Sequence, residues 1–254
     1  NKFKKNHLKK KHQILFKTLN CKNYYRVENL YKFLLSEKNS FIFESVEKGS
    51  IKGRYTIIGL NPDKTWDINN NIATVKSGEK KTKIKVDPLA FTNKLIANFK
   101  MNIPKQLPSM ASMLVGYFSY DIIRYIENIP DSCVNDLKIP DVKLMRPKTI
   151  IIHDNLLKKI YFISNCYADE KITNYNEYYF QMIKNIRYLE NLAFNFNSIK
   201  LDLKFKKSKA KVKSNISKDK FKKIVLKAKE YIKKGDIFQV VLSQRFEAKL
   251  TKAP

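Results

Sequence analysis

"KTIIIHDNLLKKIYFISNCY", residues 148–167, contains two runs of β-branched and aromatic residues around a polar centre. Such runs favour strands, and the Asp154-Asn155 pair between them is typical of a turn. The stretch therefore predicts a strand, a turn and a second strand, with His153 near the end of the first. We expect a sheet at this point, and the segments on either side indicate what else the fold contains.

Four segments that precede this hairpin also have the composition of strands. They are residues 41–46, 54–60, 71–86 and 113–120. The first two are separated by a glycine-containing loop, and they predict a hairpin. The third range is expected to be a hairpin by itself, with its turn at Ser77-Gly78.

Helices are expected between and after these strands, at residues 27–37, 88–99, 121–130, 174–194 and 217–234. The range 174–194 is the longest, and its apolar positions recur every three or four residues along one face. Asp87, followed by Pro88, and Ser217 are predicted N-caps. Gly235 is the predicted end of the last helix.

The order of these elements is strand-rich, then helical, then strand again, which predicts an α+β fold. Residues 198–214 are rich in lysine and show no helical stripe, so we expect a linker there. Two domains follow from this boundary, residues 1–200 and residues 215–254. The second domain is expected to contain a strand over residues 237–248.

The net charge of +28 raises the hypothesis of a nucleic-acid-binding protein. Only six of the 51 basic residues are arginine, however, and dedicated nucleic-acid sites favour arginine for its planar fork. Lysine is spread along the chain beside abundant asparagine and isoleucine, which A/T-only codons can encode. We therefore interpret the charge as a compositional bias and expect no specific nucleic-acid partner.

Targeting and cysteine usage favour a cytoplasmic protein. The sequence has no apolar run of the length that a membrane span needs, and no signal peptide is expected at its basic start. Cys21, Cys133 and Cys166 are odd in number and widely spaced, which favours reduced thiols. The three histidines have no metal-ligand spacing, and six glycines do not form a phosphate-binding loop.

The stretch "FIFES", residues 41–45, combines polar and apolar residues on one predicted strand. Alternation places Phe41, Phe43 and Ser45 on one face, and Glu44 on the other. A carboxylate beside a hydroxyl could hold the ammonium or amide group of a small ligand. The alternative is a half-buried edge strand whose polar residues face water.

Two further stretches carry polar residues in apolar surroundings. In "GYFSYDIIRYIENIP", residues 116–130, Asp121, Arg124 and Glu127 are spaced for ion pairs along a helix. In "GDIFQVVLSQRF", residues 235–246, Gln239 is a polar amide within a strand that we expect to be buried, so it needs a partner. Arg245 could meet a substrate carboxylate, but we favour a structural pairing for it.

Together these stretches resemble the chorismate-utilising enzymes of the anthranilate synthase component I type. "FIFES" resembles the family's Leu-Glu-Ser stretch, "VGYFSYDIIRYIE" (115–127) its Gly-Tyr-x-Ser-Tyr-Asp motif, and "IKKGDIFQVVLSQRF" (232–246) the start of its chorismate-binding region. The resemblance implies two β-sheets flanked by helices. It also implies conversion of chorismate and ammonia to anthranilate and pyruvate with Mg²⁺, which is the first step of L-tryptophan biosynthesis.

The resemblance also assigns partners and residues. It implies a glutamine amidotransferase subunit that supplies ammonia, and feedback inhibition by L-tryptophan through Ser45, with Glu44 and Phe43 beside it. Gln239 falls on the active-site strand, where enzymes that add water to chorismate have a lysine base. A glutamine amide takes no proton near neutral pH, so Gln239 favours attack by ammonia.

Residues 1–200 would then carry a regulatory half-site, and residues 215–254 the beginning of the catalytic region. The Mg²⁺ ligands and most catalytic groups would lie downstream of residue 254, so we expect the chain to be inactive alone. The alternatives are aminodeoxychorismate synthase component I, a tryptophan-sensing module and the nucleic-acid-binding protein considered above. "FIF" in place of a leucine run, and the lysine content, are the main departures from the family pattern.

Overall fold

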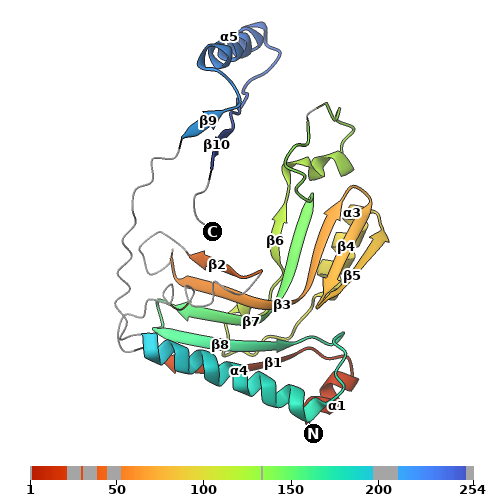
Figure 1. Cartoon of the computed structure of the whole chain (residues 1–254), viewed down its shortest axis with the longest axis vertical. Coiled ribbons are helices and arrows are strands. Elements are labelled where there is room, and N and C mark those ends of the chain that lie inside the picture. The colour runs from red at the N-terminus through yellow and green to blue at the C-terminus, as the bar shows by residue number, and fades with distance from the viewer. Residues whose placement is uncertain are drawn as a thin grey trace. The chain divides into compact units, whose positions relative to one another are not determined.

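The computed structural model describes residues 2–21, 30, 39–44, 53–132, 134–196 and 211–249. The chain divides into two compact units, Asn1–Leu201 and Asp202–Pro254, which are described separately. The first unit combines a large antiparallel sheet with helices, and the second has a small sheet and one helix (Figure 1). The predicted α+β class with two sheets is confirmed.

The first unit begins with a short helix and ends with a long one, and its strands lie between these two helices in the chain. In chain order its elements are α1 (Lys2–Leu8), β1 (Gln13–Asn20), β2 (Phe41–Glu44), β3 (Tyr55–Asn69), β4 (Ile72–Ser77), β5 (Lys80–Lys85), α3 (Pro88–Asn98), the 3₁₀ helix η1 (Ser109–Ala111), β6 (Val115–Phe118), the 3₁₀ helix η2 (Tyr120–Tyr125), β7 (Val142–Asp154), β8 (Lys159–Cys166) and α4 (Tyr175–Phe196).

The sheet of this unit has the strand order β1-β8-β7-β3-β4-β5, with β2 added on β3 and β6 added on β7. Every pairing is antiparallel, and the predicted hairpin is the β7–β8 pair, with Asp154 opposite Lys159. The β4–β5 hairpin also turns where it was predicted, at Gly78, whose φ of +57° suits glycine. Strands β2 and β3, predicted as a third hairpin, are also antiparallel neighbours, so all three hairpin predictions are confirmed.

Strands β3 and β7 are long enough to run through two halves of this sheet. In one half, β3 and β7 are flanked by β2, β8 and β1. In the other half, they are flanked by β4, β5 and β6. The two halves meet where Pro62 lies opposite Pro147, and the register shifts between Pro62 and Lys64. Proline has no N–H to donate, so the ladder is interrupted there and the strands bend, as Figure 1 shows.

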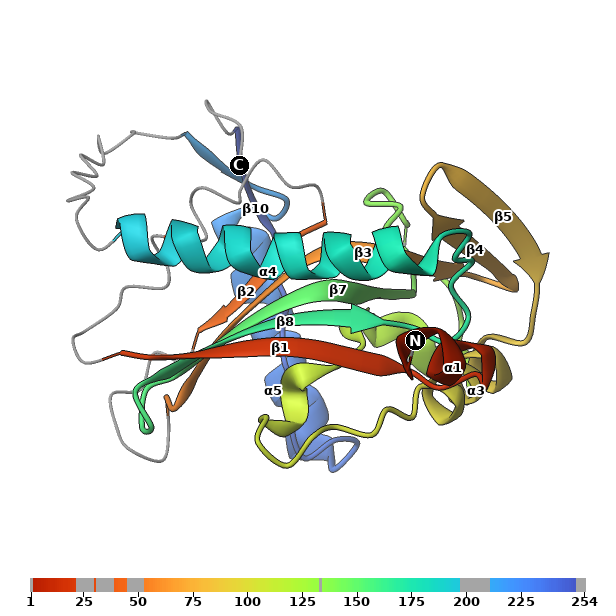
Figure 2. The same ribbon diagram turned by 90° about the horizontal axis from the view of Figure 1, so that it is seen from below.

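Buried residues form clusters on both faces of the half that contains β8, and a further cluster around Trp66 and Ile68 lies in the other half. Helix α4 lies along one face (Figure 2), where Ile186 and Leu189 pack on Ile58, Ile151 and other buried strand residues. The predicted helical stripe is thus the buried one, since Met182, Ile186, Leu189 and Ala193 are all at most 5% exposed. The opposite face is covered by Leu107 and Ala111, from the segment that precedes β6, and by Val115, the first residue of β6.

The second unit contains β9 (Val212–Ser214), α5 (Lys218–Lys234) and β10 (Phe246–Ala248), with β9 and β10 antiparallel. The side chain of Ser217 accepts a hydrogen bond from the Lys220 amide, and Gly235 has a φ of +77° at the C-cap. The predicted ends of this helix are confirmed, as is the Asp87 cap of α3, which accepts from the Ala90 amide.

Three predictions about elements need comment. The helix predicted at 27–37 lies outside the described residues, apart from Leu30. The helix predicted at 121–130 is the 3₁₀ helix η2, which ends at Tyr125 rather than at Pro130. The strand predicted at 237–248 is wrong except at Phe246–Ala248, because no other described strand of this unit lies beside it to satisfy its backbone groups. None of the described helices is both long and apolar enough to cross a membrane.

Candidate functional site

Strand β2 carries two of the three residues that the resemblance assigned to an effector site. Phe41 and Phe43 share one side of the strand, with their ring centroids 4.8 Å apart. Phe41 is buried, whereas Phe43 is 50% exposed and Glu44 is exposed at the end of the strand. Ser45 lies outside the described residues. The described part of the site therefore has a half-exposed aromatic ring on one face of β2 and, on the next residue, a carboxylate on the other face.

Gly59 on β3 fixes the position of Phe41. The two residues are paired in the ladder, and a Cβ at Gly59 would lie 2.0 Å from Cε1 of the Phe41 ring. The ring thus occupies the space that any larger residue at position 59 would need. Phe43 follows on the same side of β2, with its ring 4.8 Å from that of Phe41.

The beginning of β3, next to β2, is held by an ion pair. Nη2 of Arg54 lies 2.7 Å from Oδ2 of Asp154, a fully buried residue. The other oxygen, Oδ1, accepts hydrogen bonds from the Leu156 and Leu157 amides. Burial alone would raise the pKa of Asp154, but the bonds from Arg54 and the amides outweigh burial and lower it. The turn after β7 is thereby tied to the strand that carries Gly59.

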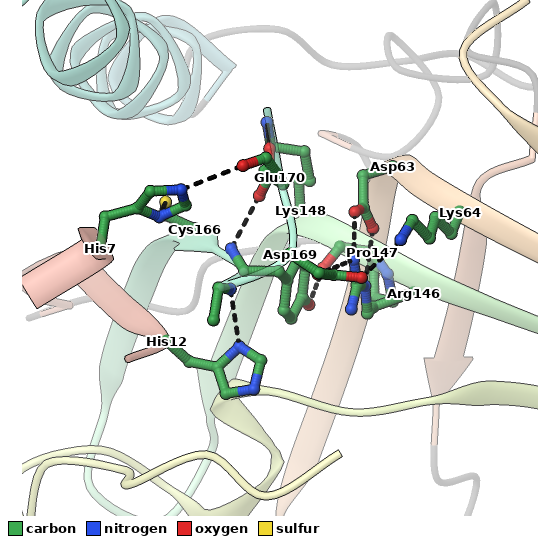
Figure 3. A network of polar contacts seen from close by, with 12 residues as sticks. His7, His12, Asp63, Lys64, Arg146, Pro147, Lys148, Cys166, Asp169 and Glu170 are labelled. Carbon is green, nitrogen blue, oxygen red and sulfur yellow. Dashed lines mark hydrogen bonds and ion pairs between the residues drawn. The ribbon is translucent and has the colours of Figure 1, made fainter. Parts of the chain in front are cut away.

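A polar cluster that the sequence did not indicate lies at the bend of the sheet (Figure 3). Arg146 on β7 donates from Nε to Oδ1 of Asp63 at 2.9 Å, and from Nη2 to Oδ1 of Asp169 at 2.9 Å. Lys64 pairs with the other oxygen of Asp169. Burial alone would raise the pKa of Asp169, but the bonds and charges of Lys64 and Arg146 lower it to about 2.

The segment after β8 completes this cluster. Lys148 and the hydroxyl of Tyr178 each donate to Oε2 of Glu170 at 2.7 Å. His7 donates from Nε2 to the carbonyl of Glu170 at 3.0 Å, and its Nδ1 lies 3.8 Å from the sulfur of Cys166. These bonds fasten α1, α4 and the segment after β8 to the sheet, so we interpret this part of the cluster as structural.

The remaining predicted residues belong to the second unit or to the segment around η2, and each is described within its own unit. Gln239 belongs to the second unit and is exposed in a segment without strand pairing, which corrects the prediction of a buried amide. Arg245 lies 3.1 Å from Glu247, which agrees with a structural pairing. Arg124 forms an ion pair with Asp121 at 3.1 Å and a second one with Asp131 at 3.8 Å, rather than the predicted pair with Glu127.

We next consider whether side chains of the described part of the chain are grouped as ligands of a metal ion. Among those residues no three His, Cys, Asp or Glu side chains gather as a metal site. The described carboxylates of the cluster are already paired with Lys or Arg, which lowers their capacity to bind a cation.

The fold and the sequence together define the class of protein. The profile of the family described as chorismate binding enzyme matches residues 38–254. The chain belongs to this family. In structure it is similar to anthranilate synthase component I from Streptococcus pneumoniae TIGR4, with a TM-score of 0.61 and 23% identity, over 93% of this chain and 51% of that one.

Two relatives show which members of the family are similar in sequence. Anthranilate synthase component 1 of Acetivibrio thermocellus is 34% identical over 235 residues, which are 89% of this chain and 46% of the relative. The same component from Acinetobacter calcoaceticus is 35% identical over 217 residues, 81% of this chain and 41% of the relative. The chain thus spans about half the length of the relatives that it matches.

The cluster around Arg146 could not be predicted from the sequence, because its members are distant in the chain. Asp63 and Arg146 are 83 residues apart, and Arg146 and Asp169 are 23 apart. One signal was available, namely an arginine directly before a proline inside an otherwise strand-like segment. An arginine in the interior of a sheet needs acidic partners, but the sequence alone does not name them.

Proposed function

We propose that the chain is part of the large subunit of an anthranilate synthase, which converts chorismate and ammonia to anthranilate and pyruvate. The observation that carries this proposal is the similarity to component 1 enzymes over most of the chain, at 34% identity in one case. A glutamine amidotransferase subunit would supply the ammonia. The reaction would be the first step of L-tryptophan biosynthesis, and the enzyme a cytoplasmic lyase.

L-Tryptophan would bind at β2 as the feedback inhibitor. The half-exposed ring of Phe43 offers a flat apolar surface on one face of β2, and Glu44, exposed at the end of the strand, would offer its carboxylate to the ammonium group of an amino acid that binds around this end. Ser45 follows directly and would contribute its hydroxyl. Residues 1–200 would thus supply one half of the inhibitor site, and residues outside this chain the other half.

Residues 215–254 would begin the catalytic region, with Gln239 directed toward chorismate. A neutral amide cannot act as a general base, but ammonia attacks through its own lone pair and needs none. The exposure of Gln239 leaves its amide available to a partner that the described residues do not supply. Mg²⁺ would promote departure of the substrate's hydroxyl group when bound, on ligands outside the described residues.

The experiment that tests this function follows anthranilate by its fluorescence. The 254-residue chain, given chorismate, an ammonium salt and Mg²⁺, is expected to be inactive, whereas the polypeptide extended through the rest of its coding sequence is expected to form anthranilate. L-Tryptophan should inhibit that reaction. Formation of an aminated product that keeps the pyruvyl group, without inhibition by L-tryptophan, would instead indicate an aminodeoxychorismate synthase.

A matched pair of variants tests the inhibitor site in the extended polypeptide. Ser45→Ala is expected to weaken inhibition by L-tryptophan about tenfold, since one hydrogen bond to a charged group contributes about 1.5–3 kcal/mol. Ser77→Ala, in the exposed β4–β5 turn, is the control and should leave inhibition unchanged. Equal inhibition of both variants would contradict the assignment of Ser45.

A further inference from the structure

A cavity of about 690 Å³ opens in the first unit between α3, the β4–β5 hairpin and the bend of the sheet. Its apolar lining includes Trp66, Phe91, Leu95 and Phe99. Trp66 is only 5% exposed and packs in the cluster that also contains Phe91 and Leu95, so this part of the lining is firmly held. Flat apolar walls of this kind suit a ring-shaped ligand.

Cationic side chains line the same cavity. Lys10, Lys64, Lys94 and Arg146 contribute four positive charges, and Asp169 is the only carboxylate among the lining residues. Lys10 and Lys94 make no ion pair with any described residue. The charges around the cavity therefore favour an anion.

Arg146 is oriented before any ligand arrives. Its Nε and Nη2 are bonded to Asp63 and Asp169, and the guanidinium lies 3.9 Å from the ring centroid of Tyr167. The Nη1 end makes no hydrogen bond to a described residue, although the side chain is only 7% exposed. A guanidinium held at one end presents its other end as a fixed donor.

His12 offers a second donor to the cavity. Its Nδ1 accepts a hydrogen bond of 3.0 Å from the Ala168 amide, so the neutral ring carries its proton on Nε2, on the other side of the ring (Figure 3). Burial, followed by the charge of Arg146, lowers the pKa of His12, which agrees with a neutral ring. The Nε2–H has no partner among the described residues.

From this arrangement we infer that the cavity binds a small carboxylate with a flat apolar ring. The ring lies against Trp66 and Phe99, and the carboxylate accepts hydrogen bonds from Nη1 of Arg146 and Nε2 of His12, with Lys94 nearby. A neutral ring would use only the apolar walls, and inorganic phosphate only the donors. This site is separate from the proposed inhibitor site at β2 and does not depend on the proposed function.

Trp66 gives a direct measurement, because it is the only tryptophan in the chain. Benzoate titrated into the 254-residue chain is expected to produce a saturable change in Trp66 fluorescence. Benzamide, which has the same ring without the charge, should bind at least about tenfold more weakly, since charge-assisted hydrogen bonds contribute about 1.5–3 kcal/mol. Inorganic phosphate should also bind about tenfold more weakly, because it leaves the apolar walls unused.

Variants locate the site without disturbing the buried cluster. Lys94→Ala removes an exposed cation that lines the cavity, and it should weaken benzoate binding about threefold to tenfold. Lys80→Ala on β5 removes an exposed cation outside the lining and is the matched control. Phe99→Ala should weaken benzoate and benzamide alike, and circular dichroism establishes that each variant is folded.

The outcomes decide the inference. Saturable benzoate binding that is selective over benzamide and phosphate, and sensitive to Lys94 but not to Lys80, supports it. Absence of saturable binding, equal binding of benzamide, or equal effects of the two lysine variants overturns it. Phe43→Ala, which affects only the proposed inhibitor site, should leave benzoate binding unchanged.

Discussion

Replacement of Gly59 by alanine tests how β2 is held to the sheet. The new Cβ would lie 2.0 Å from Cε1 of Phe41, so the ring must leave the place where it is now buried. Loss of a buried phenylalanine side chain costs about 1.5–3 kcal/mol. Alanine in a strand recovers about 0.5–1 kcal/mol relative to glycine. We therefore expect Gly59→Ala to lower the free energy of unfolding by about 1–2 kcal/mol.

The double variant separates the steric effect from other consequences of the change. Phe41→Ala alone should cost about 3 kcal/mol or more. In that background the Cβ at position 59 meets no ring, so Gly59→Ala should be neutral or stabilising by up to about 1 kcal/mol. The coupling between the two positions is then about 2 kcal/mol, well above the additivity error for independent sites.

Urea unfolding followed by the fluorescence of Trp66, which lies in the same unit, measures each free energy. Gly78→Ala is the matched control. It has no atoms within 4 Å of its new Cβ and a positive φ, so its cost should simply add to that of Phe41→Ala. If Gly59→Ala costs as much without the Phe41 ring as with it, the proposed contact does not hold β2.

Three further predictions concern other parts of the molecule. Burial raises the pKa of Cys21 to about 11 and that of Cys166 to about 12, so alkylation measured by peptide mass spectrometry should be slow at both cysteines until the chain unfolds. Burial, then the charge of Arg146, lowers the pKa of His12 from 6.5, so the unfolded chain binds that proton more readily than the folded chain. The free energy of unfolding, measured in urea, should therefore fall as the pH drops below about 6.5. His12→Phe should show a smaller change of this free energy with pH. Ser217→Ala removes the cap of α5 and should destabilise its first turn by about 1 kcal/mol, which amide hydrogen exchange would detect; unchanged exchange would mean that the cap contributes little.

Local patterns in the sequence predicted local structure well. The β7–β8 hairpin, the stripe on α4 and the cap at Ser217 each depend on residues close together in the chain, and all three are confirmed. The alternation in "FIFES" also placed Phe41 and Phe43 on one side of β2 as predicted. Short-range rules suffice where the interacting residues are themselves near in sequence.

Features that depend on distant partners could not be predicted. The strand expected around Gln239 has the right composition, but a strand forms only where a neighbour satisfies its backbone. The cluster around Arg146 joins residues from β3, β7 and the segment after β8, whose proximity is a result of the sheet order. The bend that brings them together depends on two prolines meeting across strands, and each proline alone gives no such information.

The facing prolines Pro62 and Pro147 also divide the sheet into two parts that we expect to open independently of one another. Amide protons of β3 and β7 on either side of the interruption belong to separate blocks of the ladder, so one block can open without the other. Native-state exchange should accordingly show two protection levels along each strand, with the higher one in the half that α4 covers. The pair β3–β7 would then show two different free energies of local opening. The boundary between them would lie at the cluster around Arg146.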